Sequence, residues 1–352
     1  MKDIVSYFLI EGTIIEIEEN SSGLVNKTYI INTTKSKYLL QKINQYVFKK
    51  PNEVMENIEL VTEHLKNKNI RTLDIIKTKD LKSYYFDNTN YYRMYKYMSD
   101  LENVNLDFDK VCLEVGKSIG KFQLDLFDLD IEKLYDTIPN FHNFLSRIND
   151  LITSYKNSTF DDIRKYNSTK YYNYILSYVS KNMVILNNIK KGLIPIRVTH
   201  NDTKLNNILF NKITKKAECL IDLDTVMPGS LLFDYGDACR SSIVTVDENS
   251  KDIQNIDLND KKFIYLTIGY LSKVKELLNE VEVENLVDSI GLIIMECATR
   301  FLTDYLDHDV YFKTDYQEQN LDRVINQLTL YERYLNKENL YKEYVRIILN
   351  RL

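Results

Sequence analysis

Three polar side chains in the middle of the chain have the types and spacing of a metal-assisted transfer site. Asp202 and Asn207 stand in the segment Val-Thr-His-Asn-Asp-Thr-Lys-Leu-Asn-Asn at 198–207, and Asp222 follows in Ile-Asp-Leu-Asp. A carboxylate such as Asp202 can orient a hydroxyl group and accept its proton. Amide and carboxylate oxygens, here of Asn207 and Asp222, are ligands that Mg²⁺ prefers. Together these residues indicate transfer of a phosphoryl group to a hydroxyl.

The spacing H-x-D-x-x-x-x-N is typical of the catalytic loops of kinases. We expect its His200 to brace the loop by hydrogen bonds rather than to move protons. So short a pattern also occurs by chance, and an Asp in a loop is usually a cap or a turn residue. The context favours the functional interpretation, because β-like runs at 208–210 and 218–221 follow and Asp222 ends the returning strand. In an extended segment Asp224 would face the same side as Asp222 and could bind metal or touch the acceptor.

A β-rich region precedes these motifs. Its alternating apolar residues and intervening turn signals predict antiparallel hairpins. The expected strands are 13–18, 26–32, 37–43, 83–86 and 91–97. Pro51 opens a helix in which Val54, Ile58, Val61 and Leu65 recur on one face.

Helical periodicity dominates from about residue 99 onward. The predicted helices are 108–125, 141–153, 168–190, 261–279, 283–306 and 321–348. The fold class predicted is therefore α+β and bilobal, like that of kinases. A small β-rich N-terminal lobe at 1–98 would bind nucleotide. A large helical C-terminal lobe at 99–352 would carry the catalytic hairpin and bind the substrate. Clefts between domains are common ligand sites.

The residues that would hold the nucleotide are less clearly marked. Gly23 lies between the first two strands, where a loop covering phosphates belongs, although a single glycine also suits a plain hairpin turn. Gln41 and Lys42 lie on the third strand, and only one of them can face a cleft. Lys42 is the electrostatic candidate, with Glu59 or Glu63 on the following helix as its partner, and a solvated ion pair on the surface is an equal alternative. Tyr97 stands at the connector between the lobes.

Two later clusters have competing structural explanations. Asp234, in Phe-Asp-Tyr-Gly-Asp, would either buttress the catalytic loop or cap a helix N-terminus. Arg300 and Asp304 are spaced i,i+4, which by itself favours an ion pair along one helix face. The functional alternative is that Arg300 clamps a substrate together with Tyr311.

Composition excludes several other classes of protein. The chain has 352 residues, a formal net charge of −5 and four cysteines without a C-x-x-C pair. A mildly acidic chain does not favour binding to nucleic acid or to anionic membranes. Scattered cysteines argue against a zinc site and a disulfide scaffold and fit a reducing compartment. No apolar run approaches the roughly 20 residues of a membrane span. We expect a cytoplasmic protein, with a monomer favoured.

The sequence also resembles a known family. Segments 198–207 and 221–229 are similar to the aminoglycoside phosphotransferase superfamily and, within it, to the N-acetylhexosamine 1-kinases. Further matching stretches are 233–237, 300–306 and 311–312, and the similarity runs through nearly the whole chain. The longer motif, which extends through Met-Pro-Gly at 227–229, is much more specific to this family than the H-x-D pattern alone.

The resemblance implies an ATP- and Mg²⁺-dependent kinase that phosphorylates the anomeric oxygen of N-acetylglucosamine and N-acetylgalactosamine. It assigns the base to Asp202, metal binding to Asn207 and Asp222, and sugar contacts to Asp224, Arg300 and Tyr311. Two positions depart from the expected pattern. Leu24 replaces a polar residue, and Gln41 occupies a slot where relatives often have a basic residue.

Two alternatives stay open at this point. The nearer one is another kinase of the same superfamily, acting on choline, homoserine, an aminoglycoside or a different sugar. The other is a catalytically inactive, nucleotide-binding regulatory protein, which the presence of Asp202, Asn207 and Asp222 disfavours. The sequence does not rank the two epimeric N-acetyl sugars, which differ at one hydroxyl.

Overall fold

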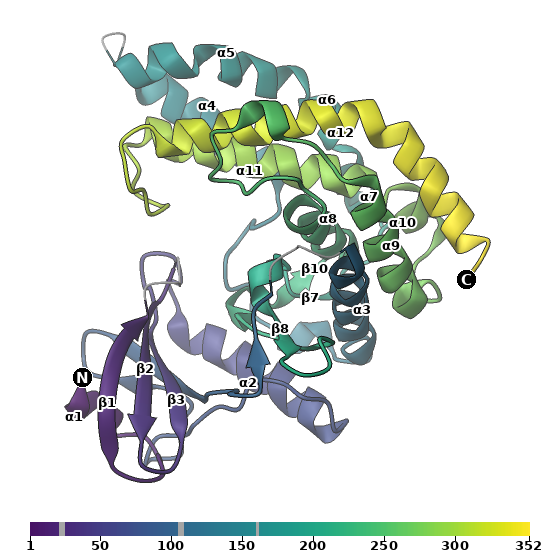
Figure 1. Cartoon of the computed structure of the whole chain (residues 1–352). Coiled ribbons are helices and arrows are strands. Elements are labelled where there is room, and N and C mark those ends of the chain that lie inside the picture. Colours follow the sequence, from purple (N-terminus) through teal and green to yellow (C-terminus); the bar gives the residue numbers. More distant parts are fainter. Residues whose placement is uncertain (21–24, 105–108, 160–161) are drawn as a thin grey trace. The chain divides into compact units, whose positions relative to one another are not determined.

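The computed structural model describes residues 1–20, 25–104, 109–159 and 162–352, which form two compact units (Figure 1). Unit N consists of Met1–Asn103, Asp125–Pro139 and Ile208–Pro228. Unit C consists of Val104–Leu124, Asn140–Asn207 and Gly229–Leu352. The division of lobes at residue 98 stays a prediction. The hairpin that follows the H-x-D motif belongs to the same compact unit as the N-terminal segment.

Unit N is built on a five-stranded antiparallel sheet of order β1-β2-β3-β5-β4. Its strands are β1 (Ile14–Asn20), β2 (Lys27–Thr33), β3 (Lys37–Lys42), β4 (Tyr85–Phe86) and β5 (Tyr91–Lys96), and a short helix α1 (Lys2–Val5) precedes them. The predicted hairpins are confirmed, with residue 41 opposite residue 93 across β3 and β5. One face of the sheet packs into a core around Phe8, Ile31, Leu40 and Met94.

Helix α2 (Pro51–Asn67) begins at the predicted proline, whose fixed φ and missing N–H suit the first helical position. Its predicted apolar stripe is buried. Asn57, also buried, donates from its side-chain amide to the carbonyl oxygens of Tyr135 (2.8 Å) and Val226 (2.9 Å). This one side chain therefore ties together the three chain segments of unit N.

A second, three-stranded sheet in unit N has the order β6-β8-β9. It consists of β6 (Leu101–Glu102), β8 (Ile208–Asn211) and β9 (Ala217–Leu220), all antiparallel. The predicted hairpin at 208–221 is thus confirmed. The segment that follows it is not extended, so the condition under which Asp224 would face the same side as Asp222 is not met. Asp222 is left-handed (φ 63°, ψ 54°), and a 3₁₀ turn, Leu223–Thr225, follows before β10 (Met227–Gly229).

Unit C is helical. Its helices are α3 (Asp109–Asp125, the last residue of which belongs to unit N), α4 (Phe144–Asn157), α5 (Ile163–Ser177), α6 (Val179–Asn182), α7 (Val184–Lys190), α8 (Leu231–Ser242), α9 (Asp260–Val274), α10 (Glu280–Glu284), α11 (Asp288–Leu306) and α12 (Gln319–Leu349). Strand β7 (Arg197–Thr199) leads into the H-x-D motif, and the 3₁₀ turn Leu205–Asn207 ends it. Two further 3₁₀ turns are Ile131–Lys133, in unit N, and Ile253–Asn255.

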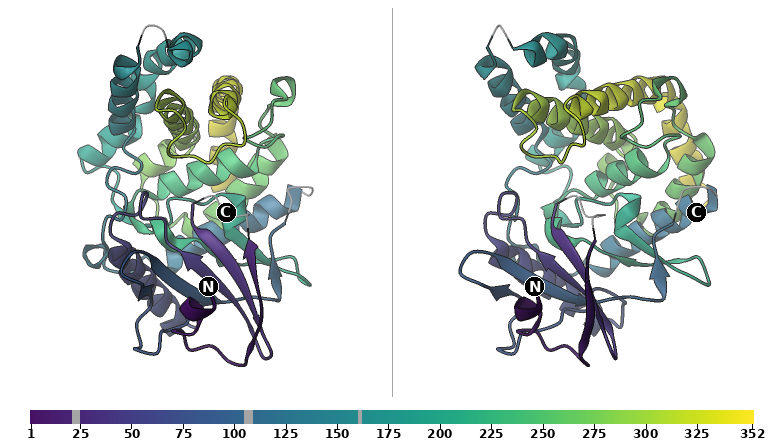
Figure 2. Two further views of the ribbon diagram at one scale, coloured as in Figure 1. Left: turned by 90° about the vertical axis from the view of Figure 1, so that its left-hand side faces the viewer. Right: turned by 60° about the vertical axis from the view of Figure 1, so that its left-hand side comes forward.

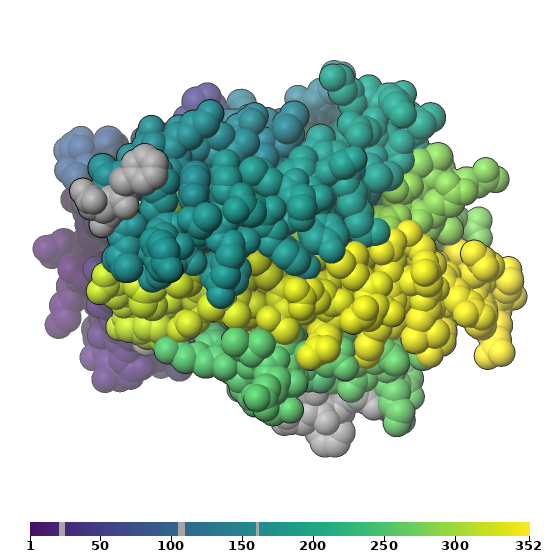
Figure 3. All heavy atoms as spheres, turned by 90° about the horizontal axis from the view of Figure 1, so that it is seen from above, coloured from purple at the N-terminus to yellow at the C-terminus, as the bar shows by residue number. Residues whose placement is uncertain are grey.

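Helix α11 forms the centre of unit C. It is buried along almost its whole length and packs against α12, α8, α4 and α5. The pairing of α11 with α12 can be followed in two further views (Figure 2). From above, α12 crosses the surface as a yellow band beside the teal helices, with the green segment around 253–255 on its other side (Figure 3). A helix buried on all sides provides a rigid base for side chains at its ends.

Helices α3 and α9 cross closely enough to require glycine on both. A Cβ at Gly116 would lie 2.0 Å from the carbonyl oxygen of Leu266, and one at Gly269 would lie 2.2 Å from that of Leu113. Any larger residue would push the two backbones apart. None of the helices in the described part of the chain has the length and apolarity needed to cross a bilayer.

Three helix predictions differ from the structure. The segment 168–190 forms parts of three helices, because the backbone opens at Tyr178 (φ −104°, ψ 5°) and turns again at Met183. The segment 283–306 contains the end of α10 and the separate helix α11. Helix α8 was expected only as a helix start, since nearly all of its residues are buried and it has no polar face to give a periodic signal.

Candidate active site

The loop 198–207, here called the HxD loop, is anchored in unit C by one carboxylate from α8. Asp234 accepts hydrogen bonds from the backbone N–H of Asn201 (2.7 Å) and of His200 (3.1 Å). Gln123 of α3 also donates to it (3.0 Å), and Thr203 donates its hydroxyl to the carbonyl oxygen of residue 234 (2.6 Å). Ser230, not Asp234, caps α8. The capping role considered for Asp234 is therefore wrong, and this carboxylate instead holds the loop.

Asp202 lies at the mouth of the loop, with its side chain 27% exposed. Its Oδ2 accepts from Lys204 Nζ at 2.9 Å and from Asn207 Nδ2 at 2.8 Å. Burial raises the pKa of the Asp202 carboxyl, but Lys204, His200 and the amide of Asn207 outweigh burial and leave the pKa below its ordinary value. The carboxylate is therefore ionised at neutral pH, as a proton acceptor must be.

His200 is fully buried inside the loop. Its Nδ1 lies 3.3 Å from the backbone N–H of Asp202, and its ring meets Phe122 of α3 edge to face at 5.6 Å. The histidine thus contacts the peptide group of Asp202. This is the geometry of a brace, although the role assigned to His200 stays a prediction.

Arg300 and Tyr311 lie together in unit C. Arg300 donates to the Tyr311 hydroxyl (3.2 Å), and its guanidinium lies 5.2–5.4 Å from the ring centroids of Phe141, Tyr311 and Phe312. Arg300 is also close enough to Asp202 for the two charges to interact. The structure therefore brings the predicted clamp residues near the predicted base within one unit.

The ion pair favoured between Arg300 and Asp304 is wrong. Asp304 is buried and accepts from the backbone N–H groups of Tyr311 (2.7 Å) and Phe312 (2.9 Å), as well as from Asn320 Nδ2 (2.8 Å). Its carboxylate thus fixes the segment that carries the aromatic side chains. The two residues share Tyr311 as a neighbour instead of pairing with each other.

In unit N, Asp224 is buried in an ion pair with Arg93 of β5. Asn26 Nδ2 donates to the second carboxylate oxygen at 2.7 Å, and Arg93 Nε donates to Gln41 Oε1 at 2.9 Å. The charge of Asp222 also acts on Arg93. Asp224 faces this cluster because the chain turns at Asp222. Its role as a sugar contact stays a prediction.

Arg93 is the main residue that the sequence interpretation missed. Its side chain is 1% exposed, and it lies opposite Gln41, the position where a basic residue was expected. A basic side chain therefore lies beside position 41 but belongs to the neighbouring strand, β5. The available signal was an arginine within the run Tyr-Tyr-Arg-Met-Tyr, since a charge flanked by core residues requires a buried partner.

The other predicted nucleotide residues have diverse surroundings. Lys42 is partly buried at the end of β3, and Glu59 of α2 contacts Lys77 instead of Lys42. The Lys37 ammonium lies over the aromatic ring of Tyr97, 4.9 Å from the ring centroid. Gly23 lies outside the described residues. These residues share unit N with Gln41, and their nucleotide contacts stay predictions.

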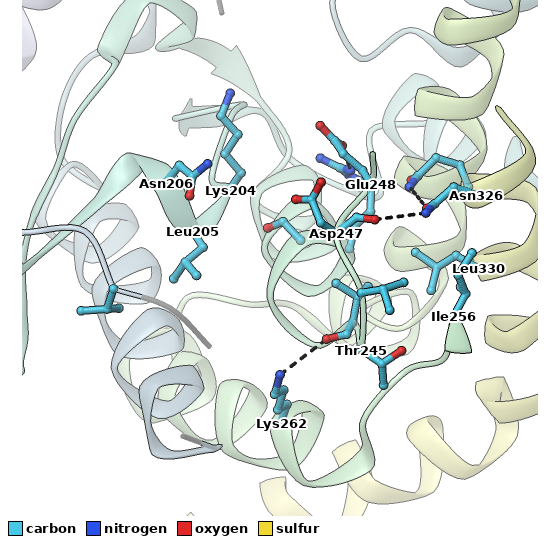
Figure 4. A pocket seen from close by; sticks show the side chains of 16 residues that line it. Lys204, Leu205, Asn206, Thr245, Asp247, Glu248, Ile256, Lys262, Asn326 and Leu330 are labelled. Atoms are coloured by element: carbon cyan, nitrogen blue, oxygen red, sulfur yellow. Dashed lines mark hydrogen bonds and ion pairs between the residues drawn. The ribbon is translucent and has the colours of Figure 1, made fainter. Parts of the chain in front are cut away.

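A pocket of about 450 Å³ opens beside the HxD loop within unit C (Figure 4). Its volume is in the range of small-ligand sites. Lys204, Asn206, Arg240 and Asn326 are among its lining residues, and Asp202 and Arg300 are not. Arg240 is ion-paired with Asp237 and Glu248. The pocket therefore borders the loop at Lys204–Asn206, and Lys204 also bonds to Asp202 at 2.9 Å.

Comparison with known proteins identifies the family. A model described as the phosphotransferase enzyme family (APH) matches residues 16–256, more than half of the chain. An aminoglycoside phosphotransferase from Alicyclobacillus acidocaldarius has a similar structure, with TM-score 0.64, 11% identity, and coverage of 100% of this chain and 97% of that chain.

Two further solved structures are similar. Choline kinase from Cryptosporidium parvum has TM-score 0.61 at 16% identity and covers 99% of this chain and 93% of that one. A spectinomycin phosphotransferase in complex with ADP and spectinomycin has TM-score 0.54 at 11% identity and covers 98% and 96%. The predicted α+β, kinase-like fold is confirmed, and the chain belongs to the phosphotransferase enzyme family.

Proposed function

We propose that this protein is an ATP- and Mg²⁺-dependent small-molecule kinase that phosphorylates the anomeric hydroxyl of N-acetylhexosamines. Membership of the phosphotransferase family supports the transfer reaction. A similar structure that was solved with ADP supports a nucleotide donor. The identity of the acceptor is inferred from the surroundings of Asp202 and from the resemblance of the motifs.

The observation that carries the proposal is the positive charge around the base. Asp202 Oδ2 lies 2.9 Å from the Lys204 ammonium, and the charge of Asp202 is among those that raise the pKa of Arg300. Because the Lys204 ammonium offsets the charge of Asp202, a quaternary ammonium or polyamine acceptor would find less negative charge here to bind it. A neutral, hydroxylated acceptor would meet hydrogen-bond donors instead. Aromatic rings at 141, 311 and 312 add the apolar surface on which a sugar ring can lie.

The roles follow from the chemistry of each group. An anomeric hydroxyl is more acidic than other sugar hydroxyls, so an ionised carboxylate of low pKa suffices as its proton acceptor. Asp202 would orient this hydroxyl and take its proton as the new bond to the γ-phosphorus of ATP forms and the bond from that phosphorus to ADP breaks. Arg300 and Tyr311 would hold the sugar by hydrogen bonds. Positioning of this kind supplies much of the rate in phosphoryl transfer.

The donor set fits a magnesium ion. Asn207 donates its amide nitrogen to Asp202, which leaves its amide oxygen as a ligand, and Asp222 offers a carboxylate. Such hard oxygen ligands suit Mg²⁺. When bound, the ion neutralises charge on the phosphate oxygens.

The experiment that tests the proposal measures ADP release with ATP and Mg²⁺ over a panel of acceptors. The panel contains N-acetylglucosamine, N-acetylgalactosamine, glucose, galactose, choline, homoserine and kanamycin, and phosphorus NMR identifies any product. An anomeric phosphate of the N-acetyl sugars, absent with Asp202→Asn, is the expected result. Turnover of choline or kanamycin alone would overturn the acceptor class. No turnover with any acceptor would favour the regulatory alternative.

A further inference from the structure

A histidine outside the HxD loop holds the peptide group that precedes Asp202. His142 lies before α4, and its side chain is 8% exposed. Its Nε2 lies 3.1 Å from the carbonyl oxygen of Asn201, and its Nδ1 lies 3.2 Å from Glu296 Oε1 on α11. The N–H end of the same peptide group, at Asp202, faces His200 Nδ1 at 3.3 Å. Two imidazoles therefore hold the two ends of this peptide.

Both ring nitrogens of His142 face acceptor oxygens. A carbonyl oxygen has no proton to give, and neither does an ionised carboxylate. A neutral imidazole carries only one N–H, so it can satisfy one of the two acceptors, and the Glu296 carboxylate attracts that proton more strongly than the Asn201 carbonyl does. The imidazolium form carries two N–H groups and satisfies both. The geometry itself thus calls for the charged histidine.

The surroundings favour the same form. Burial lowers the pKa of His142, but the charges of Glu296 and Asp237, the hydrogen bond to Glu296 and that to the Asn201 carbonyl outweigh burial and raise the pKa above its ordinary value. The rings of Phe141 and Phe233 cover the imidazole at 4.7 and 4.9 Å. Arg147 and Arg300 also act on Glu296 and compete with the histidine for its charge.

The backbone at Asn201, whose carbonyl group His142 contacts, is in an uncommon conformation. Asn201 has φ 63°, a region that a non-glycine residue occupies only when its surroundings require it. Its N–H is fixed by Asp234 and its C=O by His142. If the second contact is lost, the peptide can rotate, and the Asp202 side chain rotates with it. An error of 1 Å in a reacting group can cost about 100-fold in rate.

We propose that His142 is a positioning residue for phosphoryl transfer, whose imidazolium form locks the Asn201–Asp202 peptide and whose deprotonation releases it. The inference rests on the proposed function in taking Asp202 as the base. Because the histidine acts while protonated, kcat is full at lower pH and falls as pH rises through the pKa of His142. Substrate KM changes little, since His142 is not placed against the substrate.

Kinetic pH profiles of three variants test the inference. His142→Gln keeps an N–H donor for the Asn201 carbonyl but does not titrate, so kcat near neutral pH stays within about fivefold and the alkaline decline disappears. Glu296→Gln removes the charge that raises the pKa of His142, so the decline moves to lower pH by about one unit or more. His308→Gln, at a largely exposed histidine, leaves the profile unchanged. An unaltered alkaline decline in His142→Gln overturns the proposal.

A second measurement does not depend on turnover. The chain has four histidines, so ¹⁵N-edited NMR of the imidazoles can resolve them, with His142→Gln identifying the signal. Two protonated ring nitrogens near neutral pH are expected, followed by loss of one proton above it. A neutral His142 below pH 6.5, its ordinary pKa, overturns the inference. If no acceptor in the panel reacts, the proposed function fails, yet this titration still decides the state of His142.

Discussion

The amide nitrogen of Asn207 donates hydrogen bonds of 2.8 Å to both the carboxylate and the backbone carbonyl of Asp202. The residue predicted to bind metal therefore also fixes the residue predicted to be the base. These two functions meet in one side chain because the 3₁₀ turn Leu205–Asn207 folds the loop back on itself.

Asn207→Ala should impair both metal use and turnover. Loss of the amide oxygen removes a metal ligand, and loss of the nitrogen frees the Asp202 carboxylate. We expect a fall of roughly 10–100-fold in kcat and a similar rise in the Mg²⁺ concentration that gives half-maximal rate. Steady-state rates at varied Mg²⁺ check this. Asn206→Ala, at the neighbouring position, serves as the control. An unchanged Mg²⁺ dependence would exclude Asn207 as a ligand.

Asp202→Asn should abolish proton acceptance while preserving the shape of the loop. The asparagine can still accept from Lys204 and from Asn207 through its amide oxygen. We expect kcat to fall by about 10²–10⁴-fold with little change in the acceptor KM. Retention of more than about a tenth of wild-type kcat would argue against Asp202 as base. Initial rates at saturating ATP and varied acceptor make the measurement.

Lys204→Met should move the acidic limb of the kcat/KM profile. The pKa of Asp202 is held below its ordinary value, and Lys204 is the foremost group that lowers it against the effect of burial. The wild type therefore stays active until pH falls through the lowered pKa. In the variant the pKa rises, and activity is lost at higher pH. Lys215→Met, at an exposed lysine paired with Glu102, should reproduce the wild-type profile. Coincident profiles of wild type and Lys204→Met would refute this electrostatic link.

Arg93→Met should destabilise unit N. It leaves the Asp224 carboxylate buried without its partner, at a cost of about 3–5 kcal/mol. Hydrogen exchange of the β5 and 222–225 peptides, read by mass spectrometry, would show faster opening. Replacing both residues, as Arg93→Met with Asp224→Leu, should recover part of the loss. Lys50→Met breaks an exposed pair with Glu53 and should cost under about 1 kcal/mol. Equal effects of Arg93→Met and Lys50→Met would contradict the buried-pair account.

The fold and part of the site were predictable because their signals are local. Hairpins, the proline-initiated helix and the H-x-D spacing depend on residues close together in sequence. The contact between Arg93 and Asp224 was not predictable, because it depends on a strand register and on a left-handed residue at 222. His142 was missed for a related reason. The two oxygen atoms that accept its hydrogen bonds belong to α11 and to the HxD loop, which are distant in sequence, so no local pattern predicts these contacts.

The bonds of Asn57 have a consequence for biosynthesis. Its side chain is buried against carbonyl oxygens of residues 135 and 226, which emerge from the ribosome much later than α2 itself. Domains usually fold as units while the chain is being made. Strand β6 cannot form its three-stranded sheet until β8 and β9 have been synthesised. Asn57 likewise lacks its last partner until residue 226 is synthesised. A fragment that ends near residue 103 would consequently leave this amide exposed to solvent, with β6 lacking its neighbouring strand.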